Sequence, residues 1–277
     1  MEMCHVHVYA ASPARHHRLS SRAQHEPAHA QYGLQDIEPA RRLSWPIEPG
    51  RLPAFVDAAR LLNIRGCSIT IPHKIDIIPL LDKTSENVRE MGACNTLYRD
   101  GEKICGENTD VIGFTAPLRK RSLSPETRVL VLGAGGVSRA AIAGLRRLGL
   151  ANITLTNRRK ERAEALCNEF GLLCASWEER GDVPADLIIN TTPLGMTGAQ
   201  EHETPYPRAF QDNGIAYDLI YTPFQTRFLR DAAAAGWETV SGLDMFIGQG
   251  DAQFHLWTGH HLPEEAITAV TSALYGQ

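Results

Sequence analysis

The sequence has no long apolar run and no excess of basic residues, and each absence excludes a class of protein. No uninterrupted apolar segment approaches the roughly 20 residues that a membrane-spanning helix needs. Lys and Arg total 28 against 32 Asp and Glu, which gives a formal net charge of -4. The basic stripe of a protein that wraps DNA or RNA is therefore missing. We expect neither a membrane nor a nucleic acid among its partners.

The sequence also has no paired cysteine motif. Its cysteines are scattered, without a C-x-x-C pair or a histidine at zinc-finger spacing, so we expect buried reduced thiols and no metal site. The first residues lack the basic-then-apolar order of an export signal, which favours a cytoplasmic location. The histidines that gather before residue 30 form no recognisable ligand pattern, and a solvated helix face or chance is the simpler interpretation. The six cysteines are Cys4, Cys67, Cys94, Cys105, Cys167 and Cys174.

What is present is the composition of a folded protein, with 43% hydrophobic and 22% charged residues. A chain of 277 residues predicts one large or two medium domains. From residue 128 onward, short apolar stretches alternate with helical ones, a pattern typical of parallel strands joined by crossover helices. The predicted strands are 128–133, 152–157, 185–190 and 215–220, and the predicted helices are 137–148 and 159–170.

The first part of the chain also alternates, with candidate strands at 5–9 and 67–70 and a helix at 52–62. A polar stretch at 120–128, which contains Pro125, cannot contribute much core and marks a domain boundary. The last part, 245–275, is predicted to form two helices around Leu262 and Pro263. The sequence therefore predicts an α/β protein of two domains.

A glycine-rich loop lies between the strand at 128–133 and the helix that follows it, which is the context of a dinucleotide site. Gly133 permits the tight turn, while Gly135 and Gly136 let backbone N–H groups approach a pyrophosphate at the helix N-terminus. Ser138 takes the sixth position of G-x-G-x-x-G, so the match is imperfect, and an ordinary strand-to-helix turn is the alternative. The residues predicted to contact the dinucleotide here are Gly133, Ala134, Gly135, Gly136 and Val137.

The end of the next strand bears on which dinucleotide is bound. A site that selects NAD places Asp or Glu there, on the ribose hydroxyls. This chain instead has Asn157, Arg158 and Arg159, and guanidinium groups bind a 2′-phosphate by charge-assisted hydrogen bonds. The sequence favours NADP over NAD. A merely solvated helix start is less favoured, because cations at a helix N-terminus oppose its dipole.

Three polar clusters in the first domain lie within apolar or glycine-rich sequence, which suggests a cleft where loops converge. They are Ser68-Ile-Thr-Ile-Pro-His-Lys74, Gly92-Ala-Cys-Asn-Thr96 and Gly106-Glu-Asn-Thr-Asp110. In this order they resemble the N-V-T-x-P-x-K, G-A-x-N-T and G-x-N-T-D patterns of the shikimate dehydrogenase family. The resemblance continues through Gly133-Ala-Gly-Gly136, Asn157-Arg158, Asn190-Thr-Thr-Pro-Leu-Gly-Met196, Tyr217-Asp-Leu-Ile-Tyr-Thr-Pro223, Gly242-Leu-Asp-Met245, Gln249 and Phe254-His-Leu-Trp-Thr-Gly259.

The resemblance implies an N-terminal α/β substrate domain (1–118), a doubly wound Rossmann-type NADP domain (119–245) and C-terminal helices (246–277) that return to the substrate domain. It implies reversible oxidation of shikimate to 3-dehydroshikimate with NADP, a step of chorismate and aromatic amino acid biosynthesis. Lys74 and Asp110 match the catalytic pair of the family. Substrate contacts match Ser12, Thr70, Asn95, Asp110, Tyr221 and Gln249, and cofactor contacts match Asn157, Arg158, Arg159, Thr191, Thr192, Leu219, Gly242 and Met245, besides the glycine loop.

The chemistry of an alcohol oxidation is consistent with this pair. Transfer of a hydride to a nicotinamide requires the hydroxyl proton to leave, so an acceptor must lie within hydrogen-bond reach. Lys74 can accept the proton only as a neutral amine, which burial favours and the charge of Asp110 opposes. The plainer alternatives are a surface lysine at a turn for Lys74 and a helix N-cap for Asp110.

The chain departs from the family pattern at three positions that we place on the substrate side. Ala10 replaces the first of two carboxylate-binding serines, of which only Ser12 remains, while Ser68 replaces an Asn and Asp244 a Gly. Loss of one hydroxyl donor to a carboxylate removes about 1.5–3 kcal/mol. Quinate, aminoshikimate or another ring hydroxy acid therefore remains an alternative substrate, and a catalytically weak NADP-binding paralogue an alternative function. The sequence leaves open whether the chain forms a homodimer.

Overall fold

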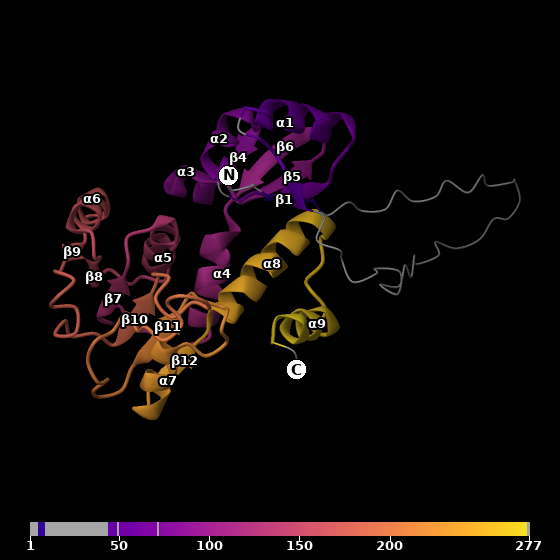
Figure 1. Cartoon of the computed structure of the whole chain (residues 1–277). Helices are drawn as coiled ribbons and strands as arrows, with labels where there is room; N and C mark the ends of the chain where they lie inside the picture. Colours follow the sequence, from indigo (N-terminus) through magenta and orange to yellow (C-terminus); the bar gives the residue numbers. More distant parts are fainter. Residues whose placement is uncertain (1–4, 9–43, 49, 71, 276–277) are drawn as a thin grey trace, which may run out of the picture.

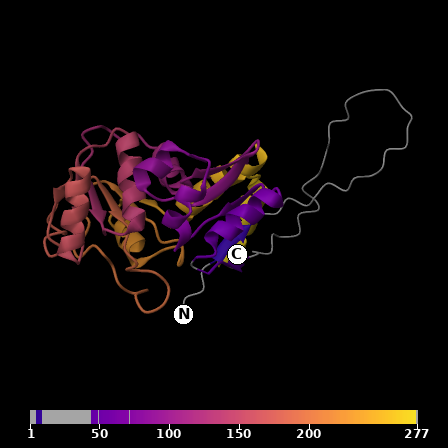
Figure 2. The ribbon, with the colours of Figure 1, turned by 90° about the horizontal axis from the view of Figure 1, so that it is seen from above.

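The structure, a computed structural model, describes residues 5–8, 44–48, 50–70 and 72–275. It contains two six-stranded sheets, one on each side of residues 110–128. The two sheets and their helices occupy opposite ends of the molecule (Figure 1), and the view from above in Figure 2 shows the same separation. The predicted α/β class with two domains is confirmed. No helix in the described part of the chain is long and apolar enough to cross a lipid bilayer.

The first sheet is mixed and has the strand order β2-β1-β3-β5-β6-β4. Among the described strands of this sheet, only β4 and β6 pair in parallel, while β5 and β6 form an antiparallel hairpin. Gly101 closes this hairpin with φ +58°, a left-handed conformation that glycine adopts without strain. The strands are β1 His5–Val8, β2 Ser44–Pro46, β3 Gly66–Ser68, β4 Lys83–Thr84, β5 Thr96–Asp100 and β6 Lys103–Glu107.

Helix α1 supplies the main apolar face against this sheet. Its Leu52 and Val56 are buried together with Cys67, Leu97 and Ile104 of the strands. The short helix α2 follows the loop after β3, and α3 begins at the N-cap Ser85, whose hydroxyl accepts a hydrogen bond from the Val88 N–H. The helices of this part are α1 Leu52–Leu61, α2 His73–Asp76, the 3₁₀ turn Ile78–Leu80 and α3 Glu86–Met91.

The second sheet is wholly parallel, with the order β9-β8-β7-β10-β11-β12. The direction in which the chain adds strands reverses between β7 and β10, and such a switch point opens a crevice at the carboxyl ends of the strands. The strands are β7 Val129–Leu132, β8 Ile153–Thr156, β9 Leu173–Cys174, β10 Leu187–Asn190, β11 Ile215–Asp218 and β12 Glu238–Val240.

Both faces of the second sheet are covered. The side chains of β7 alternate: Val129 and Val131 pack into the core with α5 and α6, and Leu130 and Leu132 into the core with α7. An apolar run with no polar alternation is therefore what this central strand requires. The helices are α4 Thr109–Leu118, α5 Gly136–Arg147, α6 Lys160–Phe170, α7 Arg227–Ala234, α8 Gly242–Thr258 and α9 Glu264–Tyr275.

Helices α4 and α8 carry the chain from one sheet to the other and lie side by side (Figure 1). A Cβ built on Gly113 of α4 would lie 2.5 Å from the Met245 O and 2.7 Å from the Gln249 N of α8. Glycine is therefore required at this crossing, because any side chain would separate the two backbones. At its far end, α8 donates from the Trp257 Nε1 to the Leu97 O of β5 at 2.9 Å.

The predicted elements are present with shifted boundaries. The strand expected at 67–70 is β3, which ends at Ser68, and the strand expected at 215–220 ends at Asp218. Helix α8 begins at Gly242, three residues before the expected start, because Ser241 and Asp244 form a capping box there. The strand expected at 5–9 is β1, and its last expected residue lies outside the described residues.

Candidate active site

Lys74 and Asp110 meet as predicted. The Lys74 Nζ donates to the Asp110 Oδ2 at 2.8 Å, and the two side chains are 28% and 18% exposed. Lys74 lies in the first turn of α2 and Asp110 in the first turn of α4. The pair is therefore sheltered from bulk water while one side of it remains open to a ligand. The alternative of a surface lysine at a turn does not fit, because Lys74 lies in a helix and is paired with Asp110.

The N-cap of α4 is Asn108. Its Oδ1 accepts from the Asp110 N–H at 3.1 Å, and its Nδ2 donates to the Ala93 O at 2.9 Å. The alternative that Asp110 is itself the cap is therefore wrong. Because Asn108 takes the capping role, the Asp110 carboxylate is free to face Lys74.

Asn95 links the pair to the rest of the cleft. Its Nδ2 donates to the Asp110 Oδ1 at 2.8 Å and lies 3.4 Å from the Gln249 Oε1. Its Oδ1 accepts from the Thr109 N–H at 2.8 Å. Asn95 is 3% exposed, so these bonds fix its orientation. The predicted residues Lys74, Asn95, Asp110 and Gln249 are thus brought together in one hydrogen-bonded cluster.

His73 anchors the turn that carries Lys74, and the sequence analysis did not assign it. The His73 ring is 1% exposed and its Nε2 lies 2.8 Å from the Ile47 O. The backbone of Lys74 is held as well, because its carbonyl accepts from the Cys94 N–H at 2.7 Å. The position of His73 directly before the predicted catalytic lysine is the sequence feature that could have indicated this role.

Gln253 is a second residue that the sequence analysis did not assign. Its Nε2 donates to the Thr96 Oγ1 at 2.9 Å, and its Oε1 accepts from the Ser68 hydroxyl at 2.8 Å. The Ser68 hydroxyl is therefore engaged with α8 rather than directed at a ligand. The third departure, Asp244, is exposed, and its Oδ2 accepts from the Ser241 hydroxyl at 3.0 Å. Its place on the substrate side is not supported, because its carboxylate serves the start of α8.

Helix α8 sets the distance between the two halves of the site. Gly242 and Met245 lie in its first turns, where Gly242 touches the backbone of Leu219 and Ile220: a Cβ there would lie 2.6 Å from the Leu219 C. Gln249 follows Gly242 by seven residues, a rise of about 10 Å. The predicted nicotinamide-side residues and the Asp110 cluster are therefore joined by one rigid element.

The glycine loop forms the cradle that a pyrophosphate needs. Gly133 has φ +118°, and a Cβ on it would lie 2.4 Å from the Thr191 Oγ1. A Cβ on Gly135 or Gly136 would meet no atom within 4 Å, so these backbones face open space. The N–H groups of Gly136 and Val137 have no acceptor among the described residues. They are free donors at the N-terminus of α5, which fits an anionic ligand.

Ser138, the imperfect position of the glycine pattern, has a structural role. It is fully buried, and its hydroxyl accepts from the Gly135 N–H at 3.0 Å and lies 2.8 Å from the Thr191 Oγ1. Thr191 in turn donates to the Leu132 O at 2.8 Å. The serine therefore fixes the loop between β7 and β10, and Thr191 and Thr192 lie beside the glycine cradle as predicted.

The arginines after β8 are free to bind an anion. Arg158 and Arg159 are exposed, and neither guanidinium has a carboxylate partner in the described part of the chain. The neighbouring Lys160 instead faces Glu164, with 3.6 Å between Nζ and Oε1. Asn157 is half-buried and donates to the Arg159 O at 2.8 Å. Two unpaired guanidinium groups at this point fit the 2′-phosphate of NADP.

The remaining predicted substrate residues are less tightly tied to the cluster. Thr70 is half-buried in the loop before α2, and its carbonyl accepts from the His73 N–H at 3.0 Å. Tyr221 is 41% exposed and stacks on Phe246 of α8, with 5.1 Å between ring centroids. Ser12, and with it the departure at Ala10, lies outside the described residues.

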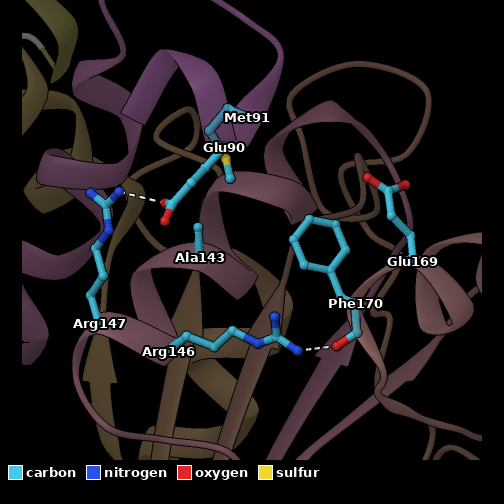
Figure 3. A pocket seen from close by; sticks show the side chains of 7 residues that line it. All are labelled: Glu90, Met91, Ala143, Arg146, Arg147, Glu169 and Phe170. Carbon is cyan, nitrogen blue, oxygen red and sulfur yellow. Dashed lines mark hydrogen bonds and ion pairs between the residues drawn. The ribbon is translucent and has the colours of Figure 1, made fainter. Parts of the chain in front are cut away.

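A separate pocket of ≈ 520 Å³ lies between α3, α5 and α6 (Figure 3). The arginines at this pocket are engaged: Arg147 pairs with Glu90 at 2.5 Å, and Arg146 donates to the Phe170 carbonyl. None of the residues predicted for the site lines it. The pocket therefore lies outside the candidate active site.

Comparison with known proteins agrees with this geometry. A profile of the shikimate dehydrogenase substrate binding domain matches residues 8–97. The shikimate/quinate 5-dehydrogenase profile matches 118–180, and the shikimate 5′-dehydrogenase C-terminal domain matches 242–270. A shikimate dehydrogenase (NADP(+)) of Pelobacter propionicus is 53% identical over 253 residues, which cover 90% of each chain. The chain belongs to the shikimate dehydrogenase family.

Solved structures of the family have the same fold. A shikimate 5-dehydrogenase of Thermus thermophilus, in complex with NADP(H) and shikimate, matches with a TM-score of 0.72 and 34% identity, covering 83% of this chain and 86% of that one. A quinate dehydrogenase of Corynebacterium glutamicum in complex with NAD matches with a TM-score of 0.71 and 30% identity, covering 80% and 82%. Family membership makes this chain an α/β oxidoreductase.

Proposed function

We propose that the chain is an NADP-dependent shikimate dehydrogenase, which interconverts shikimate and 3-dehydroshikimate. The observation that carries the proposal is the cluster of Lys74, Asp110, Asn95 and Gln249. The same chain has a glycine cradle after β7 and two unpaired arginines after β8. The relatives that share most of the chain are named for this activity. The reaction is a step in the biosynthesis of chorismate and the aromatic amino acids.

In the proposed mechanism, Lys74 and Asp110 handle the proton of the reacting hydroxyl. The residues of the second sheet that bind NADP would hold a nicotinamide ring, which would supply an acceptor for the hydride of the alcohol carbon. The Lys74 Nζ accepts the hydroxyl proton, and the Asp110 Oδ2, 2.8 Å from it, holds the amine in place and stabilises the ammonium that results. The Asn95 amide occupies the Asp110 Oδ1, which keeps the carboxylate from turning away. In the reverse direction, the ammonium returns the proton to the developing alkoxide.

The substrate and cofactor contacts follow the same proposal. Thr70, Asn95, Tyr221 and Gln249 bind the ring hydroxyls, and Ser12 binds the carboxylate. The 133–137 loop binds the pyrophosphate, with Thr191 and Thr192 beside it. Asn157, Arg158 and Arg159 bind the 2′-phosphate end, and Leu219, Gly242 and Met245 face the nicotinamide half. The domain boundaries at 118/119 and 245/246 are part of the proposal, and they are supported by the two sheets that lie on either side of the polar linker.

A steady-state assay of the purified chain tests the activity. Shikimate with NADP⁺ should form NADPH, and shikimate with NAD⁺ should form reduced cofactor with a much lower kcat/KM. Bound NADPH without turnover of any ring hydroxy acid would reject the dehydrogenase and favour a catalytically weak NADP-binding paralogue.

A second ring acid is favoured by one observation. The Ser68 hydroxyl donates to Gln253, so the position where the family has Asn offers no free hydrogen-bond donor to the ring. Quinate, aminoshikimate or another ring hydroxy acid is the alternative substrate. Comparing kcat/KM for shikimate, quinate and aminoshikimate identifies the preferred substrate. A higher kcat/KM for quinate or aminoshikimate would reject shikimate as that substrate.

Location and assembly complete the proposal. A cytoplasmic location is supported by the buried free thiols of Cys67, Cys94, Cys105 and Cys167, because reduced cysteines persist in reducing compartments. A homodimer is supported by exposed apolar side chains such as Leu61 and Leu62, which are 82% and 69% exposed. Sedimentation velocity of the purified chain tests the dimer, and a monomer at all concentrations would reject it.

A further inference from the structure

A buried carboxylate outside the proposed catalytic cluster lies at the end of β11. Asp218 is 0% exposed, and no cation faces it among the described residues: the groups that act on it are Asn190, Ile220 and Thr226. Burial raises the pKa of this carboxyl to about 7. A buried carboxylate without a cation is costly, so hydrogen bonds must compensate for its desolvation.

Three donors, one from the end of β10 and two from the loop after β11, converge on the two oxygens. The Asn190 Nδ2 and the Ile220 N–H donate to the Asp218 Oδ1, each at 3.0 Å. The Thr226 hydroxyl donates to the Oδ2 at 2.6 Å. Thr226 is also the N-cap of α7, where its hydroxyl accepts from the Leu229 N–H. All three groups donate to the carboxyl, which matches an ionised carboxylate acting only as an acceptor.

The segments held by Asp218 carry residues assigned to the cofactor and the ring acid. The Asn190 Oδ1 accepts from the Thr192 N–H at 2.9 Å and from its hydroxyl at 2.7 Å. The Asn190 carbonyl accepts from the Leu219 N–H at 3.0 Å, and the Ile220 carbonyl from the Gly242 N–H at 3.2 Å. Strands β10 and β11 are neighbours (Figure 1), so one carboxylate orders the loops at both carboxyl ends.

We propose that Asp218 is a positioning residue, whose carboxylate fixes the loop 219–226 so that Leu219 and Tyr221 face the nicotinamide half of the cofactor and the ring acid. The proposal rests on the proposed function, because that function assigns those two residues to the site. The arginines that receive the 2′-phosphate follow β8, and none of the three donors comes from that segment. Asp218 therefore does not order the segment that receives the 2′-phosphate.

The test compares ligands that reach different ends of the cofactor site. Asp218→Asn keeps the size and the acceptor at one oxygen but turns an amide donor toward Thr226, and Asp218→Ala removes all three bonds. Asp186→Asn is the matched control, because Asp186 precedes β10 at its opposite end, where its Oδ1 accepts from the Arg128 Nη2 at 2.6 Å. The probes are NADPH and adenosine 2′,5′-bisphosphate. Their dissociation constants are measured by titration at a pH above the pKa of the Asp218 carboxyl, where it is ionised.

The proposal predicts that Asp218→Ala weakens NADPH by about tenfold, with Asp218→Asn in between. Adenosine 2′,5′-bisphosphate should bind all variants within about twofold of the unchanged protein. In steady state the same variants should raise the KM for shikimate and lower kcat, while Asp186→Asn changes neither. Hydrogen exchange at the Ile220 amide should quicken in Asp218→Ala.

Equal losses for both ligands would show a general loss of folding, and unchanged NADPH affinity would show that the loop needs no anchor. Either result overturns the proposal. If Asp218→Ala does not fold, Asp218→Asn and Thr226→Val test the proposal instead. The measured quantity is again the loss of NADPH affinity relative to that of adenosine 2′,5′-bisphosphate. The binding arms need no turnover, so absence of shikimate oxidation in the unchanged protein rejects the proposed function without deciding the role of Asp218.

Discussion

At the scale of single residues, the contact between Lys74 and Asp110 carries the chemistry. Lys74→Ala should lower kcat by about 10³-fold, since a positioned proton acceptor contributes 10²–10⁴-fold. The KM for NADP⁺ should change little, because Lys74 belongs to the substrate side. Steady-state kinetics with varied cofactor and varied shikimate measures both values.

Lys83→Ala is the control for this prediction. Lys83 also faces a carboxylate, with 3.4 Å between its Nζ and the Asp100 Oδ2, but both side chains are more than half exposed. Its loss should leave kcat unchanged. A Lys74→Ala variant that retains most of its turnover would remove Lys74 from the proton transfer.

Arg158 allows a prediction about cofactor choice. Replacing it with Ala should weaken NADP⁺ by about tenfold or more while leaving NAD⁺ nearly unchanged, because only NADP⁺ presents a phosphate to the guanidinium. The same difference is expected for the reduced pair, because NADPH carries the 2′-phosphate and NADH does not, and fluorescence titration measures both affinities. Lys160→Ala is the control, since Lys160 already has Glu164 as a partner. Equal losses of NADPH and NADH affinity would contradict the 2′-phosphate assignment.

At the scale of elements, β11 makes stability depend on pH through Asp218. Burial raises the pKa of this carboxyl from 3.8 to about 7, so the folded chain binds this proton more tightly than the unfolded chain does. The free energy of unfolding should therefore fall as pH rises from about 4 to about 7, by a few kcal/mol from this group. Asp218→Asn should flatten that slope, and denaturant unfolding at a series of pH values measures it.

Asp186 supplies a control of opposite sign. Its hydrogen bond with Arg128 lowers the pKa of the Asp186 carboxyl, so its contribution is present above the ordinary aspartate range and is lost as pH falls below it. Asp186→Asn should leave the slope between pH 5 and 7 unchanged, to within about 0.5 kcal/mol. An identical slope for the unchanged protein and Asp218→Asn would contradict the assignment.

The elements differ in how far sequence predicts them. Strand β7 and helix α5 were predictable because an apolar run ends in glycines and a helical pattern follows. The two-residue strands β4 and β9 were not, because segments this short have no periodicity and exist only through pairing with β6 and β8. The β5–β6 hairpin was missed although Asp100-Gly101 is a turn signal.

The site divides in the same way. Lys74, Asp110 and Asn95 could be predicted from local patterns that resemble a family. The cap at Asn108, the Gln253 contacts and the buried Asp218 could not, since each depends on which distant segment lies opposite. Asn190 and Asp218 belong to two of the segments that resemble the family. The sequence alone does not distinguish these buried polar side chains from residues that contact a ligand.

At the scale of the whole molecule, the crossing of α4 and α8 sets how the domains meet. Gly113→Ala should destabilise the fold by about 1–3 kcal/mol, because the added Cβ meets backbone atoms that cannot move aside. It should also lower kcat/KM, since Gln249 moves away from Asn95. Thermal unfolding and steady-state kinetics measure the two effects.

Gly250→Ala in α8 is the matched control. A Cβ there meets only the Leu262 Cδ1, at 4.0 Å, and alanine favours a helix over glycine by about 1 kcal/mol. This variant should be as stable as the unchanged protein or more so, with full activity. If Gly113→Ala behaved the same way, the close crossing would not be needed for the site.

The use of α8 as a spacer has a consequence for how the chain can vary. An α-helix cannot be lengthened without also being turned: one residue inserted between Met245 and Gln249 would rotate everything beyond it by about 100°. The residue count of this interval is therefore fixed by the geometry of the helix. The number of residues in this part of α8 thus sets the distance between the nicotinamide-side residues and the ring-acid site. A single-residue deletion there should lower kcat/KM more than most substitutions do.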